Sequence, residues 1–116
     1  MKLYLDDIRH PHQSGYQDNE WIVVRNYTEF VSAIEQHFSD LEVVSFDHDI
    51  DSYDENENEV TGYDCVKWLC DYILDNYLDI TNLEIRFHTA NPVGEENMMC
   101  YWNNFYKYYR SINGWN

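Results

Sequence analysis

Two short apolar segments of this chain end abruptly in acidic side chains. Residues 3–5 are followed at once by Asp6 and Asp7, and residues 42–46 are followed by Asp47. Apolar runs of this length are typical of buried strands, whereas helices need longer runs with a 3.6-residue period. A carboxylate is costly to bury without a partner, so each strand ends where its acids begin. The sequence therefore predicts two buried strands whose carboxyl ends carry acids.

Strand and helix patterns alternate along the rest of the chain. Residues 21–24 are rich in β-branched side chains, and residues 83–87 alternate apolar and polar side chains, and both patterns are typical of strands. Three other stretches repeat apolar residues at helical spacing. Their apolar stripes are Phe30, Val31, Ile34 and Phe38; Val66, Leu69, Tyr72, Ile73 and Tyr77; and Met98, Tyr101, Trp102, Phe105, Tyr109 and Ile112. This alternation predicts an α/β fold with a mostly parallel four-stranded sheet and about three helices.

The connections between these elements are predicted to be loops. They are the polar residues 8–20, the strongly acidic residues 47–59, and residues 91–94. Asn26 is placed to cap the first helix, with Glu29 as its capping-box partner. No internal repeat or linker divides the chain, so we expect one domain over residues 1–116.

The charge of the chain limits its partners. It has 22 acidic and 7 basic side chains, a net charge of −15. Binding along nucleic-acid phosphates needs a basic surface, and anionic membranes attract basic segments. We therefore expect no extended nucleic-acid groove and no membrane association. No apolar run approaches the roughly 20 residues of a membrane span, and Cys65 and Cys70 have the setting of buried reduced thiols. These features favour a cytoplasmic location.

Reactive side chains follow the ends of three predicted strands. The clusters are Asp6 and Asp7; Asp47, His48 and Asp49; and His88 and Thr89. In open parallel sheets, ligands bind outside the carboxyl ends of the strands. We therefore expect the three clusters to meet in one crevice at that edge.

The acids in this crevice point to a bound cation. Carboxylates at close range repel one another, which raises their pKa values, and a divalent cation removes this cost. Oxygen ligands favour Mg²⁺ or Ca²⁺. The other interpretation of such acids is that they cap helices or lie in solvated loops. Two acidic clusters at strand ends favour the metal or catalytic role.

Side chains beside the acids are suited to a phosphate. His88 is expected either to act as a general acid, because nearby carboxylates would raise its pKa, or to be a structural histidine at a strand end. His48 lies between two acids and can bond to either. Thr89 and Asn91 can donate to phosphate oxygens. Arg9 could clamp a phosphate or neutralise an acid.

Four short motifs, in this order, resemble the cyclic-phosphate processing receiver domain family, a divergent relative of the two-component receiver fold. They are residues 5–7 with Arg9 and Pro11, residues 45–49, residues 61–64, and residues 88–94 with Asn97 and Met98. The resemblance covers essentially the whole chain and implies a single receiver-like (flavodoxin-like) domain. It also implies the handling of cyclic phosphates, such as 2′,3′-cyclic ends of damaged RNA or cyclic nucleotides.

The same resemblance implies roles for individual residues. In ordinary receivers an acidic pair binds Mg²⁺ together with a phospho-accepting Asp. Asp6 and Asp7 match the pair, Asp47 or Asp49 matches the acceptor, and Thr89 resembles the Ser/Thr that ends the next strand. The chain departs from such receivers because it lacks a further strand with a phosphate-contacting Lys, and because a loop replaces their first helix. These departures favour hydrolysis over phospho-signalling.

These observations predict a metal-dependent phosphoesterase acting on cyclic phosphates of nucleotides or RNA ends. Its metal, Mg²⁺ or Mn²⁺, is predicted to be held by Asp6, Asp7 and Asp47. The other predicted roles are water activation by Asp49 or His48, protonation of the leaving ribose oxygen by His88, and phosphate positioning by Arg9, Thr89 and Asn91. The alternative is a non-catalytic receiver module that binds a nucleotide or a protein partner. The sequence leaves the oligomeric state open.

Overall fold

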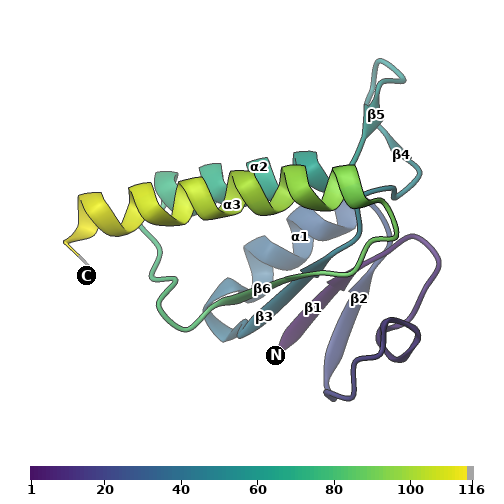
Figure 1. Ribbon diagram of the computed structural model, residues 1–116, viewed down its shortest axis with the longest axis horizontal. Coiled ribbons are helices and arrows are strands. Elements are labelled where there is room, and N and C mark those ends of the chain that lie inside the picture. Colours follow the sequence, from purple (N-terminus) through teal and green to yellow (C-terminus); the bar gives the residue numbers. More distant parts are fainter. Residues whose placement is uncertain (115–116) are drawn as a thin grey trace.

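A parallel four-stranded sheet forms the centre of the computed structural model, which describes residues 1–114 (Figure 1). The strands are β1 (Lys2–Leu5), β2 (Trp21–Val24), β3 (Val43–Phe46) and β6 (Glu84–Phe87). Their order is β2-β1-β3-β6, and each neighbouring pair is parallel. The predicted four-stranded parallel sheet is confirmed, and the carboxyl ends of the four strands therefore share one edge.

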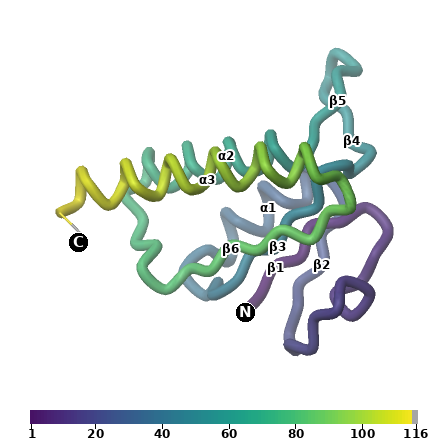
Figure 2. Tube along the Cα trace, viewed as in Figure 1, coloured from purple at the N-terminus to yellow at the C-terminus, as the bar shows by residue number. Residues whose placement is uncertain are grey.

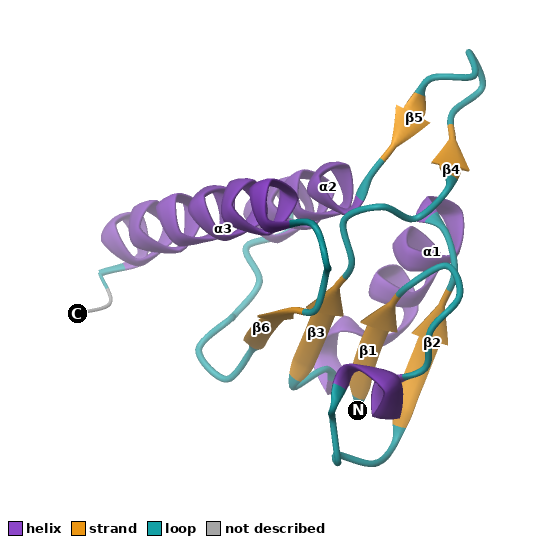
Figure 3. Ribbon diagram, turned by 45° about the vertical axis from the view of Figure 1, so that its right-hand side comes forward, coloured by secondary structure: helices purple, strands orange, loops and turns teal. Residues whose placement is uncertain are grey.

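Three α-helices cover one face of this sheet (Figure 1, Figure 3). They are α1 (Tyr27–His37) between β2 and β3, α2 (Gly62–Asp75) between β3 and β6, and α3 (Pro92–Asn113) after β6. The fully buried residues of this layer include Leu3, Leu5, Val44 and Phe46 from the strands and Phe30, Ile34, Leu69, Ile73 and Met98 from the helices. Burial of each such side chain contributes about 1.5–3 kcal/mol. This layer is the main hydrophobic core.

The opposite face of the sheet is covered by a connection that contains only one short helical turn. Successive strand residues face opposite sides, and Tyr4 and Ser45 point away from the main core. The Tyr4 hydroxyl lies 2.7 Å from Oγ of Ser14, and Oγ of Ser45 lies 2.8 Å from the Tyr16 hydroxyl. Ser14 and Tyr16 belong to residues 8–20, which include the 3₁₀ helix η1 (Pro11–Ser14). A single turn leaves no periodic pattern, so the sequence predicts only a loop here.

Side-chain caps fix where α1 and α2 begin. The Asn26 side chain accepts a hydrogen bond from the Glu29 amide (2.9 Å), as predicted. In the predicted capping box the Glu29 carboxylate would accept from the Asn26 amide. It accepts instead from the amide of Arg25, one residue earlier. At the start of α2, the Thr61 amide donates to the Asp64 carboxylate (2.8 Å). The 3₁₀ helix η2 (Phe38–Asp40) follows α1 directly.

The predicted loop over residues 91–94 is wrong, because α3 begins there. The Asn91 side chain accepts from the Gly94 amide (3.0 Å) and so caps the helix. Pro92 occupies the first helical position, where its missing N–H costs no hydrogen bond. Pro and Gly close together suggest a loop, but in this order they open a capped helix.

Two further expectations are corrected by the backbone. The predicted loop over residues 47–59 is interrupted by a small antiparallel hairpin of β4 (Ser52–Tyr53) and β5 (Glu59–Val60), which projects from the body of the molecule (Figure 2). Its strands are too short to show an alternating pattern in the sequence. α2 ends before Tyr77, which has a left-handed φ of +52° and is 88% exposed. Tyr77 therefore does not extend the buried stripe of that helix.

The cysteines lie on the helices. Cys65 and Cys70 are buried in α2, where burial raises the pKa of both thiols, and Cys100 of α3 is exposed. The prediction that Cys65 and Cys70 are buried free thiols is confirmed. Among the described residues, no helix combines the length and apolar composition that crossing a membrane requires.

Candidate functional site

A cleft of about 360 Å³ lies at the carboxyl edge of the sheet, where β1, β3 and β6 end. It is lined by Asp6, Asp7, Ile8, Arg9, Asp47, Asp49, Thr89, Ala90 and Asn91. Every predicted site residue except His48 and His88 is part of this lining. The strand ends thus bring the expected side chains together, because parallel pairing places their carboxyl ends side by side.

Three carboxylates meet in this cleft. Oxygens of Asp6, Asp7 and Asp47 lie within 4.8 Å of one another. Burial, followed by the charge of Asp6, raises the pKa of Asp47, and burial also raises the pKa of Asp7. Ionised Asp7 and Asp47 therefore carry a free-energy cost that a cation would offset. Hard oxygen donors at this spacing fit Mg²⁺ or Mn²⁺.

Asp6 is fully buried and is held on both of its oxygens. Oδ1 accepts from the amides of Ile8 (3.0 Å) and Arg9 (2.8 Å). Oδ2 accepts from Nε of Arg9 (2.8 Å) and lies 3.2 Å from Nε2 of His88. Burial alone would raise the pKa of Asp6, but the two amides and the Arg9 charge bring it below its ordinary value. Since a carboxylate offers about four lone-pair positions, Asp6 has little capacity left for a metal.

Arg9 neutralises the acids at the inner side of the cleft. Its Nε pairs with Asp6, and its Nη2 lies 3.4 Å from Oδ1 of Asp47 and donates to the His88 carbonyl (3.2 Å). Of the two roles considered for Arg9, the structure therefore contains the pairing with acids. The contact with Asp47 is longer than a well-formed hydrogen bond, so it is the weakest of these three contacts.

His88 lies beneath the cleft and not in it. Its side chain is 2% exposed, its ring stacks on Tyr4 (4.2 Å between centroids, 9° between planes), and its Nδ1 lies 2.7 Å from Oγ of Ser45. Burial lowers the pKa of His88 to about 4, an effect that outweighs the attraction of the Asp6 charge. The expectation of a raised pKa and a protonated acid is therefore wrong. The structural interpretation of a histidine at a strand end describes this ring.

Asp49 reaches the cleft and His48 supports it from behind. Asp49 is 63% exposed and lines the cleft, and its Oδ1 lies 2.9 Å from Nδ1 of His48. The side-chain amide of Asn91 donates to the other oxygen of Asp49 (3.3 Å). These two hydrogen bonds, the His48 bond first, lower the pKa of Asp49. Asp47 and Asp49 thus both line the cleft while His48 does not, as strand alternation predicts.

Two glycines allow residues 47–49 to pack closely against the helices. A Cβ on Gly62 would overlap the carbonyl group of Asp47, and the Gly62 amide donates to the His48 carbonyl (2.7 Å). A Cβ on Gly94 would lie 2.5 Å from the His48 ring. Neither glycine was predicted as a site residue, although both lie in motifs that carry the family resemblance. Their roles depend on contacts between distant segments, which no local pattern reveals.

The amino end of α3 forms another side of the cleft. Ala90 and Asn91 line it there, and Oγ1 of Thr89 accepts a hydrogen bond from the Asn91 amide (3.2 Å). A helix amino terminus carries partial positive charge and binds anions well. The cleft therefore joins a carboxylate cluster suited to a cation with a helix end suited to a phosphate.

Comparison with known families agrees with this arrangement. A sequence model described as Cyclic-phosphate processing Receiver domain matches residues 1–104. The chain belongs to this family. No match is found among curated proteins, and none among solved structures. The family ties this receiver domain to the processing of cyclic phosphates.

The receiver domain also keeps the departures that the sequence indicates. Within residues 1–114 the main sheet has four strands, so the further Lys-bearing strand of ordinary receivers is missing from the described part of the chain. The connection from β1 to β2 is residues 8–20 with the short turn η1 in place of a full helix. The described part of the chain therefore departs from ordinary receivers at both places that the sequence indicates.

Proposed function

We propose that this receiver domain is a metal-dependent phosphoesterase that hydrolyses cyclic phosphates, on nucleotides or on RNA ends. The observation that carries the proposal is the meeting of Asp7 and Asp47 in a cleft that the amino end of α3 also borders. The family's link to cyclic-phosphate processing supplies the substrate class.

Asp7 and Asp47 are the residues that would hold Mg²⁺ or Mn²⁺, with Asp6 fixed behind them by its own partners. When bound, such an ion neutralises phosphate charge and generates a nucleophilic water at neutral pH. Charge neutralisation matters here because a chain of net charge −15 repels an anionic substrate.

Phosphate oxygens would bind between Thr89, Asn91 and the amino end of α3. Asn91 faces the cleft with a side-chain amide that already donates to Asp49. Arg9 would add a third contact, because a phosphate oxygen could replace Asp47 as the acceptor of one Nη2 hydrogen while Nε stays on Asp6 and Nη2 keeps the His88 carbonyl.

Asp49 would act as the base, since it lines the cleft and His48 supports it. Asp49 accepts a proton from water, the water oxygen forms a bond to phosphorus, and one phosphorus–oxygen bond to the ribose breaks. His48, whose Nδ1 lies 2.9 Å from Oδ1 of Asp49, would hold the carboxylate in place, and protonated Asp49 would then give its proton to the departing ribose oxygen, so that the step balances. The product is a ribose phosphomonoester. Buried His88 takes no part in this proton transfer.

One observation favours a second function, a regulatory receiver module that binds a cyclic nucleotide without hydrolysing it. The pairing of Arg9 with Asp6 and Asp47 neutralises part of the carboxylate cluster without any metal. A cleft balanced in this way can bind a phosphate through Arg9 and α3 alone. The two functions differ in whether product forms and whether a metal is required.

The test is hydrolysis of 2′,3′-cyclic AMP, and of an RNA oligonucleotide with a 2′,3′-cyclic phosphate end, followed by phosphorus NMR. Each reaction is run with Mg²⁺, with Mn²⁺ and with EDTA. The variants are Asp47→Asn and Asp49→Asn, and the matched control is Asp71→Asn, an exposed acid on α2 away from the cleft.

Phosphomonoester should form only with metal. Asp47→Asn and Asp49→Asn should each lower the rate at least about 100-fold, the scale of acid–base and metal contributions, and Asp71→Asn should leave it unchanged. A higher melting temperature of the protein with 2′,3′-cyclic AMP, without product, would support the regulatory module. Neither turnover nor stabilisation with any cyclic phosphate would overturn both functions.

A further inference from the structure

A chain of buried hydrogen bonds runs from residues 8–20 to the carboxylate cluster. The Tyr16 hydroxyl lies 2.8 Å from Oγ of Ser45, and Oγ of Ser45 lies 2.7 Å from Nδ1 of His88. On the other side of the ring, Nε2 of His88 lies 3.2 Å from Oδ2 of Asp6. Ser45 and Asp6 are fully buried, and the His88 side chain is nearly so.

The ionised Asp6 carboxylate and the neutral form of the His88 ring, which burial favours, together set the direction of every hydrogen bond in this chain. An ionised carboxylate only accepts, so Nε2 of His88 must carry the hydrogen that faces Asp6. In the neutral ring the other nitrogen, Nδ1, has no hydrogen and accepts from the Ser45 hydroxyl. Oγ of Ser45 then accepts from the Tyr16 hydroxyl. One arrangement of hydrogens satisfies the whole chain.

Aromatic packing holds the ring in place. His88 stacks on Tyr4, and Tyr16 lies edge-on to His88 at 6.2 Å between centroids. Tyr4 is itself hydrogen-bonded to Ser14 at 2.7 Å, and its hydroxyl lies 3.4 Å from the Asp6 carboxylate. Ser14 and Tyr16, both within residues 8–20, are therefore each connected by hydrogen bonds to the buried carboxylate of Asp6.

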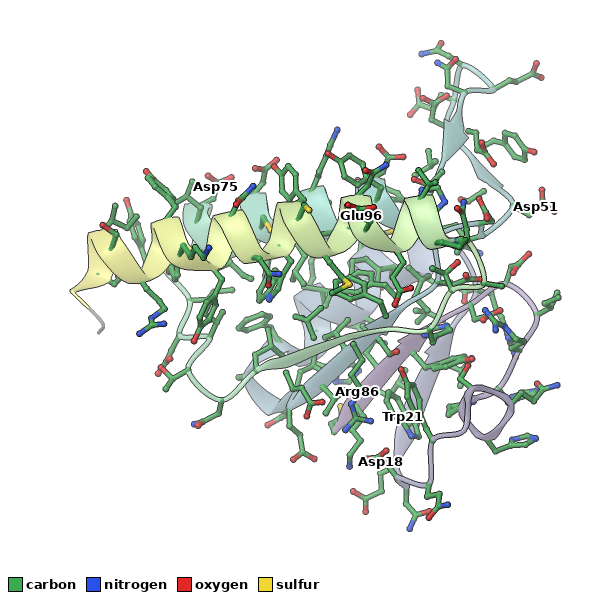
Figure 4. The ribbon with its side chains drawn as sticks, viewed as in Figure 1. Asp18, Trp21, Asp51, Asp75, Arg86 and Glu96 are labelled. Carbon is green, nitrogen blue, oxygen red and sulfur yellow. The ribbon has the colours of Figure 1, made fainter. Side chains whose placement is uncertain are left out.

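Tyr16, at the outer end of this chain of hydrogen bonds, is also held by packing and by a cation. Tyr16 stacks on Trp21 (5.4 Å between centroids, 12° between planes), and Arg86 lies over the Tyr16 ring at 5.1 Å. Arg86 is paired with Asp18 at 2.9 Å, and these residues gather below the sheet near Trp21 (Figure 4). The segment that replaces a receiver helix is thus tied to the sheet by aromatic and ionic contacts.

We propose that Ser45 and His88 are positioning residues, which fix the Asp6 carboxylate from below, and that Tyr16 is the outer support of this chain. Asp6 in turn holds Nε of Arg9, whose Nη2 reaches Asp47. The placement of Arg9 in the cleft therefore depends on a hydroxyl of the sheet. The orientation of Asp6 is a property of the protein without metal or substrate. Only the use of that orientation in catalysis rests on the proposed function.

The test is nitrogen NMR of the His88 ring and of the Arg9 side chain in ¹⁵N-labelled protein with neither metal nor substrate. The wild type should show His88 with hydrogen on Nε2 and a hydrogen-bonded Nδ1. Ser45→Ala should move the Nδ1 signal toward that of a ring nitrogen without a hydrogen bond. It should also speed water exchange of the Arg9 Nε–H about tenfold, as loss of about 1.4 kcal/mol of hydrogen bonding implies.

Two controls separate positioning from general loosening of the fold. Ser52→Ala removes another nearly buried hydroxyl near the same edge and should move neither signal. The Nε–H of Arg86, which donates to Glu84, should keep its exchange rate in Ser45→Ala. Tyr16→Phe keeps the stacked ring and should give a smaller change of the same sign at Nδ1, so the inference stays testable if Ser45→Ala fails to fold.

Hydrogen on Nδ1 of His88 in the wild type would overturn the inference. So would an unchanged Arg9 exchange rate in Ser45→Ala, or in Tyr16→Phe an Nδ1 signal identical to the wild type. Since no metal or cyclic phosphate is present, a failure of the proposed hydrolysis leaves this result unaffected.

Discussion

Replacing Asp7 by Asn should stabilise the metal-free protein and remove its response to metal. The Asp7 carboxylate lies within 4.8 Å of oxygens of Asp6 and Asp47, and burial raises its pKa. An amide of nearly the same shape keeps the packing and removes one negative charge. If the Asp7 carboxylate served only the fold, its replacement would destabilise the protein, so the sign of the change separates the two roles.

The size of the effect follows from the spacing of the charges. Two unit charges 4.8 Å apart repel each other by about 3.5 kcal/mol at an effective dielectric constant of about 20. Arg9 offsets much of this repulsion through its contacts with Asp6 and Asp47, and water screens the partly exposed Asp7. We expect a net gain of about 1 kcal/mol, a rise of about 4 °C in the melting temperature for a domain of this size.

The assay is thermal unfolding in EDTA and in Mg²⁺ or Mn²⁺. Metal at ten times its dissociation constant should stabilise the wild type by about 1.4 kcal/mol, and Asp7→Asn should show no such shift. Asp71→Asn lowers the charge equally and should keep the full metal response. A lower melting temperature of Asp7→Asn in EDTA, or an unchanged shift with metal, would refute the reasoning.

Three further changes have defined outcomes. Gly94→Ala should push the His48 ring from Asp49 at a cost of about 1–3 kcal/mol; unmoved His48 ring signals in NMR would contradict this. Asn26→Ala should lower the free energy of unfolding in urea by about 1 kcal/mol, because the α1 cap is lost; an unchanged value would show that the cap contributes nothing. In the native protein a thiol reagent should modify Cys100 quickly and the two buried thiols only after unfolding; fast reaction of a second thiol would argue against the packing of α2.

Much of the architecture could be predicted because burial leaves a direct record in the sequence. Residues 43–46 are apolar apart from Ser45, since β3 is covered on both faces, and the run ends where Asp47 can meet partners. The same rule located the site, because parallel strands bring their ends together. Strand ends thus predicted both the sheet and the lining of the cleft.

The parts that escaped prediction depend on contacts between distant segments. A histidine at a strand end can turn into the cleft or beneath it, and only the pocket formed by Tyr4 and Ser45 decides the position of His88. Ser45 is itself a hint, as a hydroxyl inside an apolar strand needs a partner. That partner, Tyr16, lies 29 residues away in the sequence.

Arg9 shows the same limit at the level of charge. The sequence allowed it to bind either a phosphate or an acid, and the choice follows from the two carboxylates that its guanidinium meets in the folded chain. Residues 47–59 were predicted as a solvated loop, because their acids and the shortness of the two strands conceal the hairpin. For both segments the local sequence correctly predicted polar residues but did not identify the residues that they contact in the folded chain.

We infer that the cleft at the carboxyl edge of the sheet holds both a divalent metal and the cyclic phosphate. Its most direct test is a crystal structure of the protein soaked with Mn²⁺ and a non-hydrolysable analogue of a 2′,3′-cyclic nucleotide. We expect an anomalous peak at the carboxylates of Asp7 and Asp47, with the phosphate beside it against Asn91 and the amino end of α3. A cleft without a metal peak, in which Arg9 still bridges Asp6 and Asp47 and the analogue lies elsewhere, would contradict it.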